Sequence, residues 1–266
     1  MIYRRKLRTI LNSTETTQKT DSIATDTLAF VLATSDAFYI GWPQKFAARY
    51  FAFGTLNTNS ISLAVTAWDG TAWTAVDDLI DQTRGFTQNG WVSWKNLSNW
   101  TKKALTPVDD EELFWIRVKV SGATSAGTAL QAVLNLFCDD VTLAAYFPEL
   151  IADTRYLPRN RTNFLEQYEA AKNMVVQKLY QAKAIKNEAM VLNPEELAVP
   201  AAHAAAYIIL NGIPNPDEDL RDRKKDILDN LEFWLSDSVR SLDLDNSGEI
   251  EPEEENIEYP IFRARL

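Results

Sequence analysis

The chain has a single cysteine, a single histidine and no apolar run of the roughly 20 residues that a transmembrane helix needs. One cysteine excludes an internal disulfide framework, so a reducing compartment is the simpler assumption. The first eight residues are basic, but no apolar segment follows them. We therefore expect neither a membrane span nor a secretory signal peptide.

Recognisable catalytic motifs are also missing. The sequence contains no nucleophile elbow, phosphate-binding glycine loop, paired cysteine motif or zinc-binding histidine pair. The one histidine, His203, lies among alanines with no nucleophile or second histidine near it in the sequence. We expect it to be a hydrogen-bonded packing residue and expect the protein not to be an enzyme.

Basic residues are scarce relative to acids in the second half of the chain. Residues 1–140 carry 13 Lys and Arg against 14 Asp and Glu, whereas residues 141–266 carry 14 against 23, so the net charges are −1 and −9. Between Asp243 and Glu258 there are eight acids and no base. This distribution argues against broad nucleic-acid binding by the second half, because phosphates would be repelled. The basic residues of the N-terminal arm, 1–25, could contact an acidic partner or nucleic acid, although a solvated terminus is the more common case.

Residues 26–140 have the pattern of an all-β domain. Apolar residues alternate with period two, as at Ile61, Leu63 and Val65, and Asp69-Gly70 separates two such runs in the way typical of a hairpin. Evenly spaced strands with turn signals predict a β-sandwich or jelly roll. The predicted strands are 28–32, 37–41, 49–53, 61–68, 73–76, 91–94, 113–120 and 130–137.

Seven of the eight tryptophans lie in this β region. They could stack on sugars, as aromatic rings do in carbohydrate-binding sandwiches, but large aromatics in a small sandwich more often form the core or an interface. We expect the second role. The seven are Trp42, Trp68, Trp73, Trp91, Trp94, Trp100 and Trp115. The acids at 77–81 and 109–112 are expected to be solvated turn residues.

Residues 141–242 read as helices. Asn193-Pro194 and Asn215-Pro216 each combine a capping residue with a first-turn proline, and Gly212 follows the first of these helices as a candidate C-terminal glycine. An antiparallel bundle follows from the apolar stripes. The expected stripes are Phe164, Tyr168, Ala171, Val175, Leu179 and Ala182 on one helix, and Ile227, Leu228, Leu231, Trp234, Leu235 and Val239 on the last.

The last segment, 243–266, begins with a twelve-residue acidic stretch that has the spacing of an EF-hand calcium loop. Ca²⁺ prefers six to eight oxygen ligands, which such a loop can provide, and Gly248 stands where the chain must turn. No second loop of this kind is present, so we expect an isolated site, with calcium as a possible ligand. The candidate ligands are Asp243, Asp245, Ser247, Glu249, Glu251 and Glu254.

An extended tail follows the acidic loop. It alternates aromatic, apolar and basic residues, and Pro260 keeps it from forming a helix. A segment of this kind can add to a sheet or lie in a groove of a partner, although a disordered tail is an equal alternative. The candidate docking residues are Tyr259, Ile261, Phe262, Arg263, Arg265 and Leu266.

Together these patterns predict an α+β chain of two domains, and that combination resembles a known family. The helical half resembles the head–tail adaptor, or head-completion, proteins of tailed bacteriophages. The front half is similar to β-sandwich domains of phage neck and tail proteins, although the minimal adaptor has no such sandwich. The helical resemblance rests on Asp140-Val-Thr-Leu143, Phe147-Pro148-Glu149, Phe164-Leu-Glu-Gln-Tyr168 and the helix from Asn193. The β resemblance rests on Trp68-Asp69-Gly70-Thr-Ala-Trp73, Gly85-Phe-Thr-Gln-Asn-Gly90 and Trp115-Ile-Arg117.

The resemblance implies a structural virion protein of the phage neck, assembled in the host cytoplasm. Copies would form a ring, commonly dodecameric, between the portal protein and a tail-side neck or stopper protein. DNA would contact the ring only by passing through its channel, which an acidic helical half could line without retaining it. The tail would dock on the portal or on a neighbouring subunit.

Two other classes remain open. A glycan- or host-binding module of a tail or collar would place exposed tryptophans in a concave surface, whereas an adaptor would bury them. A calcium-binding regulator would need paired EF-hands and an apolar groove.

Overall fold

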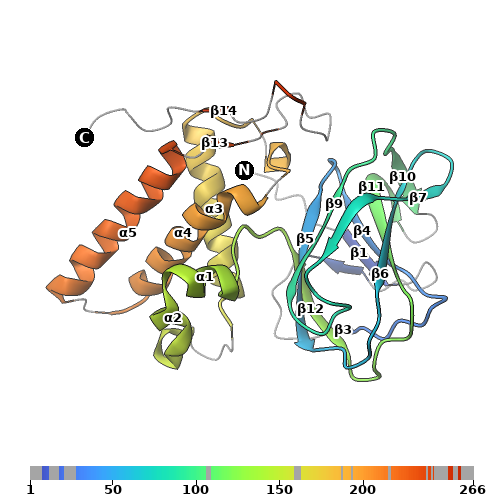
Figure 1. Cartoon of the computed structure of the whole chain (residues 1–266), viewed down its shortest axis with the longest axis horizontal. Helices are drawn as coiled ribbons and strands as arrows, with labels where there is room; N and C mark the ends of the chain where they lie inside the picture. The colour runs from blue at the N-terminus through green and yellow to red at the C-terminus, as the bar shows by residue number, and fades with distance from the viewer. Residues whose placement is uncertain are drawn as a thin grey trace. The chain divides into compact units, whose positions relative to one another are not determined.

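The computed structural model describes residues 8–11, 18–20, 28–105, 109–158, 163–186, 188–192, 194–214, 217–237, 239–240, 242, 251–253 and 257–258. Antiparallel strands make up its N-terminal part and helices its C-terminal part, which is the predicted α+β class (Figure 1). The chain divides into two compact units, one mainly of residues up to Asn135 and the other mainly of residues from Leu136 onward.

The β unit contains two antiparallel sheets. The larger has the order β2-β1-β4-β11-β6-β7, with β10 also paired to β11, and the smaller has the order β3-β12-β5-β9-β8. Consecutive strands repeatedly change sheet, for example from β4 to β5 and from β5 to β6. The strands are β1 (Arg8–Leu11), β2 (Gln18–Thr20), β3 (Leu28–Ala29), β4 (Phe38–Trp42), β5 (Ala48–Thr55), β6 (Leu63–Trp68), β7 (Trp73–Ala75), β8 (Asp77–Asp81), β9 (Gly90–Lys95), β10 (Lys102–Leu105), β11 (Asp109–Val120) and β12 (Ala129–Leu134).

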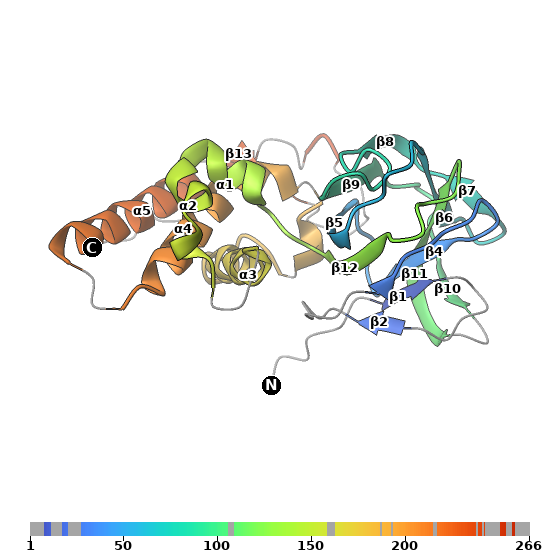
Figure 2. The same cartoon turned by 90° about the horizontal axis from the view of Figure 1, so that it is seen from below.

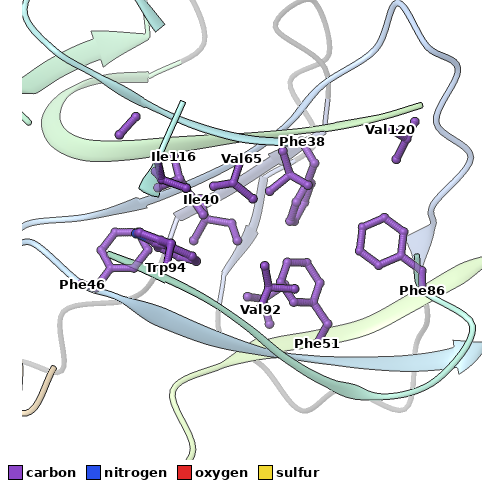
Figure 3. Close-up of a cluster of buried hydrophobic side chains, with 14 of the residues drawn as sticks. Phe38, Ile40, Phe46, Phe51, Val65, Phe86, Val92, Trp94, Ile116 and Val120 are labelled. Carbon is purple, nitrogen blue, oxygen red and sulfur yellow. The ribbon is translucent and has the colours of Figure 1, made fainter. Parts of the chain in front are cut away.

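The two sheets share one hydrophobic core, to which both contribute alternate residues of their strands. Phe38 and Ile116 come from the larger sheet, and Phe51 and Val92 come from the smaller (Figure 3). Phe86, from the loop after β8, fills the space between them and makes an edge contact with Phe30. Aromatic pairs of this kind stabilise a core beyond the area that they bury.

Several strand predictions are confirmed, but the two acidic segments that were expected to form turns belong to strands. The Asp69-Gly70 turn joins β6 to β7, and Gly70 has φ +102°, which glycine adopts without steric cost. The acids at 77–81 do not form a turn, because they make β8, an edge strand whose outer side chains remain in water. The acids at 109–112 begin β11, where they pair with β10.

The N-terminal arm contributes two strands to the larger sheet. β1 pairs with β4 from Arg8↔Gly41 to Leu11↔Phe38, and β2 pairs with β1 at the edge (Figure 2). The alternation in the arm is too short to predict strands, and the pairing with β4 supplies the missing hydrogen bonds.

The helical unit is built around α4. This helix contacts α1, α3 and α5, and all but two of its residues from Pro200 to Leu210 are buried. Five of its six alanines are buried, which allows the neighbouring helices to approach closely. The helices are α1 (Asp140–Tyr146), α2 (Pro148–Ala152), η1 (Thr154–Tyr156), α3 (Leu165–Gln181), η2 (Glu188–Met190), η3 (Pro194–Leu197), α4 (Ala198–Asn211) and α5 (Glu218–Asp237), followed by the two-residue strands β13 (Val239–Arg240) and β14 (Ile257–Glu258).

Helix boundaries differ from the predictions for local reasons. A proline fits only in the first turn of a helix, so Pro200 makes α4 begin at Ala198, and the preceding turn winds as η3. Gly212 directly follows α4, as predicted, and ends it in a right-handed conformation. The α3 stripe is confirmed except that Ala182 is half-buried.

The prediction for the last helix is wrong at two positions. α5 buries Ile227, Leu231 and Leu235 as expected, but Trp234 is exposed. Val239 is not helical, because it belongs to β13.

Candidate functional site

The predicted calcium loop lies almost entirely outside the described residues. Asp243, Asp245, Ser247, Glu249 and Glu254 are not described, and Glu251 is half-buried. The described part shows that β13 pairs with β14, with Val239 opposite Glu258 and Arg240 opposite Ile257. This pairing holds together the two ends of the segment that carries the motif. Part of the entropic cost of closing the loop is therefore offset by the strand pairing, without a cation.

The candidate docking tail is outside the described part of the chain as well. None of Tyr259, Ile261, Phe262, Arg263, Arg265 and Leu266 is described. Their role stays a prediction. Among the residues that are described, no three His, Cys, Asp or Glu side chains are grouped closely enough to hold a metal ion.

The tryptophans of the β unit are buried or half-buried. Trp94, Trp100 and Trp115 are almost completely buried, and the other four are half-buried. Trp115 lies against Gly41, where an added Cβ would be only 2.6 Å from its ring, and its indole N–H donates to the Lys103 carbonyl at 2.8 Å. Tyr39, Leu113 and Trp73 complete a second apolar cluster on the outer side of the larger sheet.

Cations cover the aromatic rings of this outer side. Lys103 Nζ lies 3.3 Å from the centroid of Trp68, and the Arg117 guanidinium lies 5.0 Å from the centroid of Trp73. Arg117 Nε also donates to Thr66 Oγ1 at 3.1 Å, which fixes its direction across β6. Such cation–π contacts hold positive charge at defined places on the surface. The cationic sheet face is defined here as Trp68, Trp73, Lys103, Arg117 and Lys119.

The sequence contained part of this signal. Trp115, Arg117 and Lys119 alternate with apolar residues, and β11 indeed puts Ile116 and Val118 into the core. The contribution of Lys103 was not predictable, because it depends on the pairing of β10 beside β6 on the same edge of β11.

A second charged surface lies on α5. Its exposed side, opposite Ile227 and Leu231, carries an aspartate every three or four residues and ends in an exposed phenylalanine. The acidic helix face is defined here as Asp219, Asp222, Asp226, Asp229 and Phe233.

The acidic helix face is unfavourable for an isolated helix. Like charges three or four residues apart destabilise a helix by about 0.2–0.5 kcal/mol per pair, and this face contains three such neighbouring pairs. Lys225 forms an ion pair with Asp229 at 3.4 Å, which offsets part of the repulsion. Phe233 is 51% exposed and packs edge-on against Trp234, itself 38% exposed.

The titratable groups at the start of the helical unit have structural roles. Asp139 caps α1 by accepting from Thr142 N at 2.9 Å, and burial raises its pKa against the opposing effect of that hydrogen bond. Burial likewise raises the pKa of the Cys138 thiol. The Tyr168 hydroxyl donates to Asp140 at 2.5 Å, and burial beside this carboxylate raises the tyrosine pKa. These contacts join α1 to α3.

His203 is a packing residue, as the sequence indicates. It is buried, its Nδ1 lies 3.0 Å from the Val199 carbonyl, and the rings of Tyr146 and Phe147 lie beside it. Burial lowers its pKa, because the charged imidazolium would lose its hydration. The neutral form therefore fits this site.

Comparisons with known proteins add no functional assignment. No protein-family model matches the chain, and no curated protein matches it. Among the helices that the structure describes, none combines the length and apolar character needed to cross a bilayer.

Proposed function

We propose that this protein is a structural component of a bacteriophage neck, whose copies form a ring that joins the portal protein to the tail and continues the DNA channel. In this proposal the β unit is a jelly-roll β-sandwich and the helical unit an antiparallel adaptor bundle. The repeated passage of the chain between two sheets and the central position of α4 support these two descriptions.

The observation that carries the proposal is the distribution of aromatic side chains. The β unit keeps its seven tryptophans buried or half-buried, whereas the helical unit exposes Tyr146, Tyr180, Phe233 and Trp234. Exposed aromatic residues are enriched at protein–protein interfaces. A scaffold with a rigid β core and aromatic helix surfaces is suited to assembly with other proteins.

The alternative is a glycan-binding sandwich, and the tryptophan geometry disfavours it. A glycan site would need exposed tryptophans, but all seven in the β unit are buried or half-buried, and Lys103 and Arg117 lie over Trp68 and Trp73. A glycan array tests this alternative directly. Saturable binding that Trp68→Ala and Trp73→Ala abolish would favour it over the adaptor.

The adaptor proposal is tested by mixing the purified protein with the portal protein of the same genome and imaging the mixture by electron microscopy. We expect added density at one end of the portal ring. Removal of residues 255–266 is expected to abolish the association. Triple substitution of Tyr259, Phe262 and Arg263 by alanine tests the tail without shortening it. Absence of any association of the full chain would contradict the proposal.

A further inference from the structure

The chain carries two surfaces of opposite charge on its two units. The cationic sheet face presents half-buried rings with Lys103 and Arg117 held over them, and Lys119 continues the row along β11. The acidic helix face presents four aspartates and then Phe233. Each combines aromatic area, which is enriched at the centre of protein interfaces, with charges of one sign, which suit the polar rim around that centre.

The two surfaces also have compatible spacing. The acids of α5 are three or four residues apart and therefore recur about every 4.5–6 Å along the axis, since each residue advances about 1.5 Å. Cations two residues apart on a strand, such as Arg117 and Lys119, are separated by about 7 Å, and adjacent strands by about 5 Å. A helix laid on the outer side of a sheet can therefore pair several of these charges while Phe233 contacts Trp68 or Trp73.

The positions of neighbouring charged residues also limit which surface can dock on each face. Glu111 shares the outer side of β11 by alternation, but it lies six residues from Arg117 and eight from Lys119, with Leu113 and Trp115 between. The middle of the sheet face is therefore cationic. On α5, Arg221 and Lys225 lie to one side of the acidic row, so a cationic partner meets the aspartates and Phe233 first.

We propose that the acidic helix face of one copy docks on the cationic sheet face of a second copy. This contact uses two different surfaces of the same chain, so it is heterologous and can close into a ring. The inference rests on the proposed function, for which it names the contact between neighbouring subunits. Opposite charges bring the copies together and fix their register, and the aromatic residues exclude water at the centre.

Charge reversal tests the contact without the portal. The helix variant is Asp222→Lys with Asp226→Lys, and the sheet variant is Lys103→Glu with Arg117→Glu. Sedimentation velocity over a range of protein and salt concentrations measures self-association. We expect the unmodified protein to associate, with association weakening as salt rises. Each variant is expected to associate about 100-fold more weakly, because it places like charges opposite each other.

An equal mixture of the two variants is the decisive sample. The lysines on α5 of the helix variant then face the glutamates on the sheet variant. The unmodified aspartates of the sheet variant face the unmodified cationic sheet face of the helix variant, so both contacts are attractive. We expect the mixture to regain association that neither variant shows alone. The matched control is Arg84→Glu with Lys95→Glu, which makes the same change of charge elsewhere on the β unit and should leave association unchanged.

Several outcomes overturn this inference. They are a monomer at every concentration, variants that associate like the unmodified protein, or a mixture that stays monomeric. A change in the compactness of the monomer, independent of concentration, would assign the contact to a single chain and also overturn it. Portal binding is measured separately, so a protein that binds the portal but never itself removes this inference and leaves the proposed function standing.

Discussion

The hydrophobic cores of the two units are built from different kinds of side chain. The β unit uses large aromatic rings, with Phe30, Phe38, Phe51 and Phe86 in mutual contact between two sheets. In the helical unit, α1, α3 and α5 pack against the buried alanines of α4, and the rest of the core is mainly aliphatic, with a few aromatic rings such as Phe164 and Tyr168. Aromatic rings therefore form the centre of the β core, whereas the helical unit buries a few of them and leaves Tyr146, Tyr180, Phe233 and Trp234 exposed.

The comparison can be measured with two probes. Seven of the eight tryptophans report on the β unit by fluorescence, and the helices dominate the far-ultraviolet circular dichroism. A change in one unit should shift the unfolding transition of its own probe.

Trp115→Ala should have the largest effect on stability. The ring is completely buried against Gly41 and its N–H has a carbonyl partner, so truncation leaves a cavity and an unpaired acceptor. We expect a loss of about 3–5 kcal/mol in the free energy of unfolding, measured by urea titration with fluorescence. Trp234→Ala on the exposed part of α5 is the contrast, with a change below about 1 kcal/mol. Equal losses would contradict the distinction between the units.

Gly41→Ala should destabilise the β unit by overpacking. The new Cβ would lie 2.6 Å from the ring of Trp115, and moving that ring costs about 1–3 kcal/mol. Gly127→Ala is the matched control, because a Cβ there meets nothing within 4 Å. If both substitutions had the same effect in urea unfolding, the close approach of Trp115 would not limit residue 41.

Asp139→Ala should destabilise the helical unit by about 1 kcal/mol, because the α1 cap is lost. Asp139→Asn keeps an oxygen that can accept from Thr142 N and removes a charge that burial disfavours. The asparagine variant should therefore lose less stability in a thermal scan followed by circular dichroism. A larger loss for asparagine than for alanine would rule out the capping role.

His203 should make the helical unit less stable in mild acid. Its folded-state pKa lies below the ordinary value, so the unfolded chain binds more protons as pH falls through about 6.5. The folded state therefore keeps its full stability above that pH and loses stability as the pH falls from there to the folded-state pKa of His203. His203→Gln removes this titration. The difference in unfolding free energy between the two proteins should therefore change between pH 8 and 5, and a constant difference would contradict the burial argument.

Calcium should affect only the segment between β13 and β14, with the smallest change in the stability of either unit. Titration calorimetry is expected to show binding heat in the unmodified protein and none after Asp243→Ala or Glu254→Ala. The matched control Glu253→Ala removes an acid that the motif does not use as a ligand and should retain the heat. No heat in the unmodified protein would reduce the loop to an acidic turn.

Much of the fold follows from local pattern. Period-two alternation located β4, β6 and β11, and Asp69-Gly70 located the hairpin, because each signal depends on neighbouring residues. The edge strands β3 and β7 were predicted, but β8 and β10 were missed. β8 is rich in aspartate and β10 is short, so both depend on the strands that pair with them.

Some candidate sites could be predicted from contiguous sequence, and others could not. The EF-hand spacing and the alternating tail are readable from the sequence, since they are contiguous motifs. The cationic sheet face is not, because Trp68, Lys103 and Arg117 come from three strands. The exposed position of Trp234 was missed because its spacing also fits the buried stripe of α5, and only the packing against α4 selects which side is covered.

The sequence by itself determined the α+β class, the change from strands to helices, the packing role of His203 and the uneven distribution of charge. Composition and periodicity set these properties, because they depend on each residue and its near neighbours. The tertiary structure decided which aromatic rings are covered, which cations lie over them, and that β13 and β14 join the ends of the acidic segment. Those properties require residues distant in sequence to meet, and strand register and helix packing bring them together.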